Sequence, residues 1–530
     1  MSLAELGTQP GKVETIEQSG QYLNDPLAAF TFLCADKSNA LLLESAEIES
    51  KDDLQSLLMV DAAMRLVCRG NQVICTALTP NGESVLPLIE AQRPEGMDVV
   101  RDGVTVTLTC HAADPSLDED SRLKAASVFD GLRMLVKQIT PLRQHPHAVF
   151  LGGVFAYDLL ATFEQLPDVP DGENDCPDYV FYLAETLLTV DHQTKETHLV
   201  GSVFSGPNVA QSYFDIAQRL EKLQARLQDI PAAPEADIHA QPDTTDVDVD
   251  KDDAAYAKDV INLKQHILSG DIFQVVPSRT FSLPCPDPIA AYAQLKISNP
   301  SPYMFYMNDE NVTVFVASPE SAIKYETQTN QVEIYPIAGT RPRGKRPNGE
   351  IDPDLDSRIE LNLREDDKEK AEHIMLVDLA RNDVAKVSRP GTRYVKDLLK
   401  VDRYSHVMHL VSRVVGQLRD DLDALHAYQA CMNMGTLVGA PKVSAASLIR
   451  GVEKKRRGSY GGAVGYLNGN GDMDTCIVIR SAFVKNDRAY IQAGAGVVYD
   501  SDPQSEADET RTKAQAVINA VRRALNTGEK

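Results

Sequence analysis

Alternating apolar and polar residues predict several strands, most of them joined by short turns. The segments VTVTLTC (104–110), HAVFLGGVFAY (147–157) and TLLTVDHQTKETHLVGSVF (186–204) have this pattern, and the polar centre of the third predicts a hairpin. Residues 461–468, 474–485 and 489–500 predict a meander with turns at 468–472 and 486–487. One further strand is expected over 272–283. Because hairpins join antiparallel neighbours, we expect antiparallel sheets.

Other segments read as helices. Residues 212–228 and 254–270 are two of them, and Gly270 is a plausible C-cap of the second. Residues 366–383 and 505–521 each carry an apolar stripe at helical spacing. Strand-rich runs beside these helices indicate an α+β fold with helices flanking the sheets, and not a doubly wound dinucleotide-binding fold.

The segment 230–253 (IPAAPEADIHAQPDTTDVDVDKDD) is rich in Pro, Ala and Asp and poor in large apolar residues. This composition is typical of a solvated linker. It divides the chain of 530 residues into an N-terminal region, residues 1–229, and a C-terminal region, residues 254–530.

Composition narrows the choice of partner and compartment. Fifty-three basic and 77 acidic side chains give a net charge of -24, which argues against nucleic acid because phosphate binding needs a basic surface. The N-terminus lacks a basic segment followed by an apolar one, and no apolar run approaches the ~18 residues that span a membrane. We therefore expect a cytoplasmic protein with no membrane partner. The cysteines form no Cys-x-x-Cys pair, which predicts neither disulfides nor a zinc site.

Two Glu-x-x-Glu pairs in the C-terminal region, Glu369/Glu372 and Glu506/Glu509, lie on the predicted helices that carry apolar stripes. Carboxylates that turn toward a core are costly unless a cation meets them. Mg²⁺ prefers oxygen ligands and keeps some of its waters, so the pairs predict a magnesium site with two direct and two water-mediated glutamates. The alternative is that these glutamates face solvent.

The segment PIAGTRPRGKR (336–346) nearly matches the phosphate-binding loop G-x-x-x-x-G-K-[ST]. Arg346 replaces the Ser/Thr hydroxyl, and Pro-Asn-Gly follows where a helix should begin. An ATP-dependent enzyme is therefore a disfavoured alternative. A Gly339–Thr340 turn beside Arg341 and Arg343 remains, and it predicts either a carboxylate site or an ordinary basic loop.

Several polar groups have apolar or glycine-rich surroundings. His409 lies on the apolar side of a predicted strand, either as a general acid/base or as a core residue. Arg480 has apolar neighbours along its predicted strand and needs an anion, from a substrate or from a structural carboxylate. The glycines of AGAG (493–496) weaken a strand unless a ligand or another backbone approaches closely. Tyr460 and Thr436 place hydroxyls beside glycines.

These segments follow one another in the order of a known family. PIAGTRPRG, DLARNDVAKVSRPGT, SHVMHLVS, GTLVGAPK, YGGAVGY, IVIRSA, QAGAGVVYDSDP and E-x-x-E-T-x-x-K occur along the C-terminal region. They resemble the chorismate-utilising enzymes, and most closely the component I (large subunit) family of anthranilate synthases. The resemblance implies antiparallel sheets packed as a large sandwich. It also implies a chorismate-binding catalytic domain over 254–530, with a regulatory or structural region over 1–229.

The resemblance further implies the ligands of the site. Glu372 and Glu509 would bind Mg²⁺ directly, and Glu369 and Glu506 would assist through water. Lys513 would balance the charge of these glutamates beside the substrate. Chorismate, a dicarboxylate, would lie against Gly339, Thr340, Tyr460, Arg480, Gly494, Ala495 and Gly496.

Three residues are implied in the chemistry, in which ammonia adds at ring C2, the C4 hydroxyl leaves, and loss of pyruvate yields anthranilate. Glu320 would protonate the hydroxyl, His409 would transfer a proton in the elimination, and Thr436 would orient the ring. Gln274 stands where water-adding relatives have a lysine base, and Ala338 where aminodeoxychorismate synthases have a nucleophilic lysine. Both differences favour anthranilate, with aminodeoxychorismate synthase component I as the alternative.

Regulation and assembly are implied in the same way. Glu44, Ser45, Pro302, Tyr303 and Met304 resemble the family's pocket for L-tryptophan, so feedback inhibition of the first committed step of tryptophan biosynthesis is expected. No cysteine lies in a Gly-x-Cys-x-Gly elbow. Ammonia is therefore expected from a glutamine amidotransferase subunit (component II), in a heterotetramer of two of each subunit. A non-catalytic tryptophan sensor is the alternative from another class.

Overall fold

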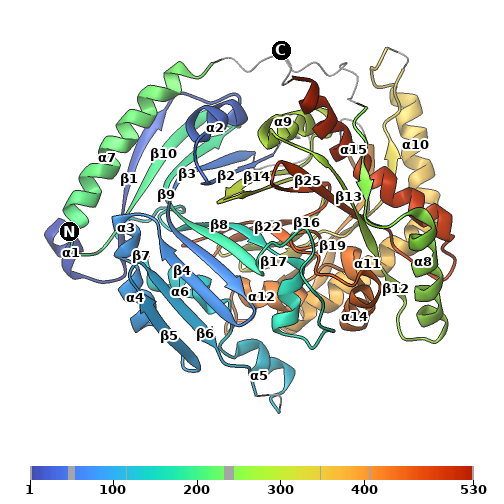
Figure 1. Ribbon diagram of the computed structural model, residues 1–530, viewed down its shortest axis with the longest axis horizontal. Helices are drawn as coiled ribbons and strands as arrows, with labels where there is room; N and C mark the ends of the chain where they lie inside the picture. Colours follow the sequence, from blue (N-terminus) through green and yellow to red (C-terminus); the bar gives the residue numbers. More distant parts are fainter. Residues whose placement is uncertain are drawn as a thin grey trace.

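Two sheets, antiparallel except for the β7–β1 pair, form the centre of the computed structural model, which describes residues 3–45, 54–114, 116–231, 244–346, 348–404 and 407–527 (Figure 1). The strands of the first sheet are, in spatial order, β7 (Thr140–Pro141), β1 (Lys12–Gly20), β10 (Glu196–Phe204), β9 (Tyr179–Asp191), β3 (Gln55–Arg69), β2 (Asn39–Glu44), β14 (Tyr303–Asp309), β15 (Val312–Ser318), β24 (Ser481–Lys485), β25 (Arg488–Gly494), β13 (Ser278–Pro284) and β11 (Asp248–Val249).

The second sheet shares β3 and β9 with the first. Its order is β5 (Met97–Asp102), β6 (Thr105–Cys110), β4 (Gln72–Ala77), β3, β9, β8 (Phe150–Phe155), β22 (Ala463–Asn468), β23 (Met473–Ile477), β16 (Ser321–Glu326), β17 (Gln331–Ile334), β20 (Val407–Gln417) and β19 (Tyr394–Arg403), and β18 (Ile337–Pro342) follows β17 along β20. Register shifts between Met59 and Met64 let β3 pass from one sheet to the other. A separate pair joins β12 (Gln274–Val275) to β21 (Gly439–Ala440).

The two sheets pack face to face. Their shared core contains Leu41 and Val316 of the first sheet with Phe150 and Val464 of the second. A Cβ added to Gly152 of β8 would lie 2.8 Å from a Leu41 methyl group of β2, so the facing strands are in direct contact. The chain therefore forms an α+β sandwich of antiparallel sheets, as predicted.

Helices cover the outer faces of the sandwich (Figure 1). Over the first sheet lie α1 (Leu3–Thr8), α2 (Pro26–Cys34), α7 (Val209–Arg226), α9 (Pro288–Ser298) and α15 (Pro503–Thr527). Over the second lie α4 (Leu86–Ala91), α6 (Asp130–Gln138), α11 (Asp367–Val387), α12 (Ala424–Cys431), α13 (Gly435–Val438) and α14 (Lys442–Glu453), and α8 (Asp253–Leu268) packs against α15. The remaining elements are α3 (Pro80–Glu83), α5 (Glu119–Lys124), α10 (Pro353–Glu365), η1 (Tyr157–Thr162) and η2 (Leu227–Asp229).

Most of the predicted elements are confirmed, but the prediction of two long strands is wrong. The hairpin of β9 and β10, the tail turns and the four helices have the expected positions, and Gly270 ends α8 with φ +83°. The strand expected over 272–283 is instead β12 and β13, in different sheets. The strand expected over 474–485 is β23 and β24, which also belong to different sheets and are separated at Arg480.

Strands from both sides of the 230–253 segment pair with each other. The N-terminal strand β2 pairs with β14, and β8 pairs with β22. Residues 232–243 of the predicted linker lie outside the described residues, and β11 follows them. Both sheets are thus built from both regions of the chain. Within the described ranges, no helix combines the length and apolar character needed to cross a membrane.

Candidate active site

Two neighbouring crossovers between the sheets position Glu320 and Arg480. Glu320 lies between β15 of the first sheet and β16 of the second, and Arg480 lies between β23 of the second and β24 of the first. The Ile477 N–H donates to the Glu320 carbonyl at 3.0 Å, and the Ala317 N–H donates to the Arg480 carbonyl at 3.1 Å. Each crossover therefore holds the backbone of the other.

The Glu320 carboxyl is buried and protonated at neutral pH. Burial raises the pKa of Glu320 to about 8, although the nearby Thr436, Lys513 and Arg480 act in the opposite direction. The buried Thr436 hydroxyl lies close enough to the Glu320 carboxyl to lower its pKa by hydrogen bonding, although the geometry is looser than that of a standard hydrogen bond. Glu320 can therefore serve as a general acid, with the Thr436 hydroxyl beside it.

Arg480 has a left-handed backbone conformation, with φ +48°, which is uncommon outside glycine and frequent at functional sites. Burial lowers the pKa of its guanidinium, and Glu320 opposes that shift. Among the described residues, no carboxylate forms an ion pair with Arg480. Because a half-buried guanidinium needs an anion, its donors fit a carboxylate of a ligand.

His409 is buried on β20, opposite Thr340 of β18. Its Nδ1 lies 2.9 Å from the Thr340 hydroxyl. Burial lowers the pKa of His409 to about 4, and the charge of Arg480 adds to this shift. The imidazole is therefore neutral at pH 7 and can accept a proton, while Glu320 can donate one.

The predicted glycines bring backbone close to these side chains. Gly339 has φ +78°, and a Cβ there would lie 3.1 Å from Glu369 Oε2. A Cβ on Gly494 would lie 3.2 Å from the Tyr460 hydroxyl, and one on Gly496 would lie 2.8 Å from Gln274 Nε2. Ala495 is buried between these two glycines. The absence of side chains at the three positions therefore lets the backbone approach Glu369, Tyr460 and Gln274 closely.

Lys513 joins the glycine segment to α15. Its ammonium donates to the Gly494 carbonyl at 3.1 Å and forms an ion pair with Glu509 at 2.7 Å. Lys513 is also close enough to Glu320 to act on its pKa. The residues 320, 409, 436, 460, 480, 494 and 513 are thus linked around one site.

The four predicted metal ligands lie on two helices that border this site. Glu369 of α11 lies against Gly339 and accepts from Arg341 at 2.9 Å, while Glu372 is half-buried one turn later. On α15, Glu506 is buried and Glu509 pairs with Lys513. Within the described ranges, no group of three or more His, Cys, Asp or Glu side chains is close enough to hold a metal ion. The oxygen donors suit Mg²⁺, and the two pairs would have to approach each other to share one ion.

The segment that resembles a phosphate-binding loop has another structure. Residues 337–342 form β18, and the next helix begins at Pro353. Arg341 binds Glu369 and Asp366, and Arg343 binds Asp356. These contacts favour the alternative of a structural basic loop, because both guanidiniums are already paired with acidic residues.

Arg457 is a buried residue near the site that sequence reasoning missed. It donates to the Leu437 carbonyl at 2.8 Å, beside Thr436, and to the Val276 carbonyl at 2.6 Å. Its guanidinium pairs with Glu453 and lies 5.6 Å from the centre of the Tyr460 ring. In the sequence it ends the charged run EKKRR, which reads as solvent-exposed, so only packing identifies its role.

The segments expected to bind tryptophan lie side by side. Glu44 ends β2 directly opposite Met304 of β14, and Ser45 and Pro302 adjoin these strand ends. Met304 packs in the core under α9, whereas Tyr303 packs on the core between the sheets. Tyr303 and Met304 therefore face opposite sides of β14.

Both faces of this region make polar contacts. The buried Glu44 carboxylate accepts from the Tyr292 hydroxyl at 2.8 Å and from Lys296 Nζ at 2.7 Å, both on α9. On the other face the Tyr303 hydroxyl donates to Asp474 of β23 at 3.1 Å. Glu44 therefore already has two donors from its own chain.

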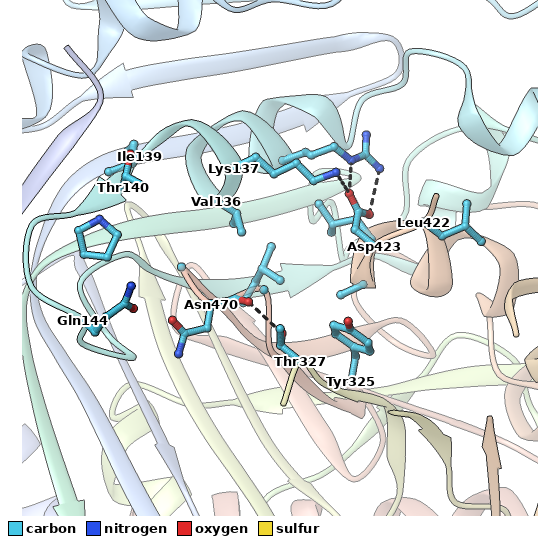
Figure 2. Close-up of a pocket in the computed structure, with 17 residues that line it drawn as sticks. Val136, Lys137, Ile139, Thr140, Gln144, Tyr325, Thr327, Leu422, Asp423 and Asn470 are labelled. Carbon is cyan, nitrogen blue, oxygen red and sulfur yellow. Dashed lines mark hydrogen bonds and ion pairs between the residues drawn. The ribbon is translucent and has the colours of Figure 1, made fainter. Parts of the chain in front are cut away.

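A surface cavity of about 470 Å³ lies apart from all these residues. Figure 2 shows it between α6, the start of α12 and the turn at Asn470, with Asp423 bound by Arg133 and Lys137. Arg133 and Lys137 both pair with the single carboxylate of Asp423, so the charged groups of the wall are tied to one another and none points alone at the cavity.

Comparison with known proteins gives a consistent result. Residues 92–519 match the family described as chorismate binding enzyme. Anthranilate synthase component 1 of Vibrio parahaemolyticus is 59% identical over 518 residues, covering 97% of this chain and 94% of that protein. Its counterpart in Escherichia coli is 54% identical over 524 residues, covering 99% and 100%.

Solved structures share the fold. Anthranilate synthase component I from Streptococcus pneumoniae aligns with a TM-score of 0.68 and 28% identity, over 89% of this chain and 93% of that one. The menaquinone-specific isochorismate synthase of Escherichia coli aligns with a TM-score of 0.66 and 19% identity, over 98% and 97%. The sandwich fold and the extent of the sequence matches lead to the same assignment. This chain belongs to the family of chorismate-binding enzymes.

Proposed function

We propose that this protein converts chorismate and ammonia to anthranilate, pyruvate and water in the cytoplasm, as the first committed step of tryptophan biosynthesis. The relatives named anthranilate synthase component 1 span nearly the whole chain. The observation that carries the proposal is the burial of Glu320 and His409 beside Arg480, which raises the pKa of Glu320 and lowers that of His409. A buried acid and a separate base are what an amination followed by an elimination needs.

Chorismate binds through its two carboxylates. One lies at Arg480 and the Tyr460 hydroxyl, and backbone groups of 494–496 and Thr340 surround the ring. Glu372 and Glu509 would hold Mg²⁺ directly, Glu369 and Glu506 would assist through water, and the ion would supply positive charge to the other carboxylate. Support comes from the oxygen donors of the two pairs and from their places beside Gly339 and Lys513.

The chemistry proceeds in two stages. Glu320 gives its proton to the C4 oxygen, which leaves as water while a C2–N bond forms with ammonia. The proton lost from the new amine replaces the one that Glu320 donated. His409 then takes the proton from C2 as the C3–O bond breaks, and that proton reaches the methylene carbon of the enolpyruvyl group, which leaves as pyruvate. Thr436 orients the ring beside Glu320.

Two positions favour amination to anthranilate over related reactions. Gln274 lies against the glycine segment, at 2.8 Å from the Cβ position of Gly496, and a neutral amide cannot activate water as a base. Ala338 lies in β18 opposite Leu410 and offers no amine for covalent catalysis. Both residues therefore favour anthranilate as the product over isochorismate or aminodeoxychorismate.

The test combines purified protein, Mg²⁺, chorismate and ammonium at mildly alkaline pH and follows anthranilate fluorescence and product masses. We expect anthranilate and pyruvate in equal amounts, and no turnover for Glu509→Gln. Absence of both products from the wild-type protein would refute the proposal. Full activity of Glu509→Gln would place the metal elsewhere.

We also propose that L-tryptophan inhibits the enzyme at Glu44, Ser45 and the segment 302–304. The pairing of β2 with β14 supports this proposal, because it brings the segments together. A direct connection to the catalytic acid exists: Tyr303 lies opposite Ser318, whose hydroxyl accepts from the Glu320 N–H at 3.2 Å. A ligand that moves Tyr303 would thereby displace Glu320.

Because the chain has no tryptophan, indole fluorescence reports the ligand alone. We expect L-tryptophan to bind and to lower the rate of anthranilate formation, and Glu44→Gln to weaken both effects. Binding without any effect on turnover would contradict the inhibitory role. If a titration shows no binding of L-tryptophan, the proposed pocket is wrong.

A further inference from the structure

Arg457 and Glu453 form a buried ion pair at the C-terminal end of α14. Their side chains are 1% and 3% exposed. Arg457 Nε donates to Glu453 Oε2 at 2.9 Å and Nη2 donates to Oε1 at 2.6 Å, so the guanidinium binds both carboxylate oxygens. Removing two charges from water is costly, and an apolar pair of similar volume often stabilises a fold as well. Stability alone is therefore a weak reason for a buried ion pair at this place.

The other hydrogen bonds of the Arg457 guanidinium go to two segments of the active site. Its Nη1 donates to the carbonyl of Leu437, the residue after Thr436, at 2.8 Å. Its Nη2 also donates to the carbonyl of Val276, two residues after Gln274, at 2.6 Å. Because the guanidinium is planar and its donors have fixed directions, it holds the two backbone segments in one arrangement.

Glu453 reaches a third segment of the site through Ser278 of β13. Its Oε1 accepts from the Ser278 N–H at 2.8 Å and from the Ser278 hydroxyl at 2.7 Å. That hydroxyl accepts in turn from Gln492 Nε2 of β25 at 2.8 Å. Gln492 lies two residues before Gly494, so the ion pair is also connected to the glycine segment 493–496.

The Tyr460 ring, whose hydroxyl lies against Gly494, is near the same guanidinium. Arg457 Cζ lies 5.6 Å from the centre of the Tyr460 ring and 4.5 Å from that of Tyr157. A guanidinium at these distances is attracted to the face of an aromatic ring. Gly461, with φ +79°, lets the Tyr157 ring approach, since a Cβ there would lie 3.1 Å from it. Arg457 therefore contributes to the placement of the Tyr460 hydroxyl.

We propose that Arg457 and Glu453 are positioning residues, which hold the segments of Thr436, Gln274 and Tyr460 in the arrangement that amination of chorismate requires. This inference rests on the proposed function, which places these three side chains at the substrate. Arg457 and Glu453 act on the reaction through the groups that they orient. Misplacement of such groups by about 1 Å can lower a rate about a hundredfold.

The experiment compares purified variants with ammonium as the source of nitrogen. Arg457→Lys keeps a positive charge opposite Glu453 but loses the planar fork. Arg457→Met/Glu453→Gln removes both buried charges and keeps an amide oxygen that can accept from Ser278. The matched control is Arg65→Lys, because Arg65 of β3 binds both carboxylate oxygens of Asp309 at the end of β14, at 2.7 and 2.9 Å. Anthranilate fluorescence gives kcat and KM for chorismate, and circular dichroism gives the melting temperature.

We expect the two changes at Arg457 to lower kcat about thirty- to hundredfold and to raise KM for chorismate no more than about fivefold, because Arg480 remains in place for a carboxylate. The double variant should still melt close to the wild-type temperature, since a neutral pair replaces a buried ion pair. Arg65→Lys should lower the melting temperature and keep kcat within about twofold of wild type. Stability and turnover would thereby change independently of each other.

A folded double variant with kcat within about threefold of wild type would overturn the inference, because the ion pair would then contribute stability alone. An equal loss of kcat in Arg65→Lys would overturn it too, since the loss would then follow from any weakening of the fold. If neither Arg457 variant folds, the ion pair is a requirement for folding and the inference is wrong. Absence of anthranilate from the wild-type protein would instead refute the proposed function itself, and the inference with it.

Discussion

Replacement of Glu320 by Gln should abolish turnover and stabilise the fold at alkaline pH. Burial raises the pKa of Glu320 from 4.5 in a model peptide to about 8 in the folded protein. Between these values the folded state holds a proton that the unfolded state has lost, so stability falls as pH rises. Glutamine has nearly the shape of the protonated acid and does not titrate, so the variant lacks this loss of stability.

The size of the effect follows from the two pKa values. One unit of pKa difference corresponds to about 1.4 kcal/mol, so the full shift of Glu320 costs the fold about 5 kcal/mol above pH 8. From pH 5 to pH 9, the stability of Glu320→Gln relative to wild type should therefore increase by about 4 kcal/mol.

Urea unfolding followed by circular dichroism at both pH values measures this difference. Glu326→Gln, an exposed glutamate on β16, is the control and should keep the wild-type dependence on pH. If the stabilities of wild type and Glu320→Gln change equally with pH, Glu320 is ionised in the fold and cannot be the acid. The catalytic rate of wild type should fall above pH 8 as Glu320 loses its proton.

Three further substitutions test the site. Arg480→Gln should raise KM for chorismate about ten- to hundredfold by removing charge-assisted hydrogen bonds, and an unchanged KM in steady-state kinetics would place the carboxylate elsewhere. Gly339→Ala should lower stability by about 1–2 kcal/mol because φ is +78° and the new Cβ meets Glu369; an unchanged melting temperature contradicts this. Arg457→Met should lower the free energy of unfolding by about 3–5 kcal/mol in urea, because it leaves Glu453 buried and unpaired. The Arg457→Met/Glu453→Gln double variant should lose much less stability. Equal losses in the single and double variants would show that the pair does not interact.

Local chemistry made much of the fold predictable. The turn at 486–487 has positive φ at both residues, which Asn and Asp tolerate, and it joins β24 to β25 where the sequence predicts. The apolar stripes of 366–383 and 505–521 form α11 and α15 because each packs on a sheet. These patterns involve residues only a few positions apart, so they predict local structure without knowledge of the tertiary contacts.

The candidate site was less predictable because it lies where the chain changes sheets. An alternating pattern treats 474–485 as one strand, but the chain crosses between sheets at Arg480, and the crossover aims its side chain at Glu320. Tyr303 and Met304 are neighbours in β14 and therefore lie on opposite faces of the strand. The family resemblance had grouped both in one pocket. Arg457 is buried only through contacts with distant segments, and no short window of sequence contains them.

The sharing of both sheets by the two ends of the chain has a consequence for synthesis on the ribosome. Strand β8 is complete about 300 residues before its partner β22 emerges, a delay of roughly 15–60 s at 5–20 residues per second. Throughout that interval the nascent chain presents the unpaired backbone of β8, and of β2 until β14 appears, to other chains. The chain is therefore more exposed to edge-to-edge pairing with other chains before its synthesis ends than after β14 and β22 have paired.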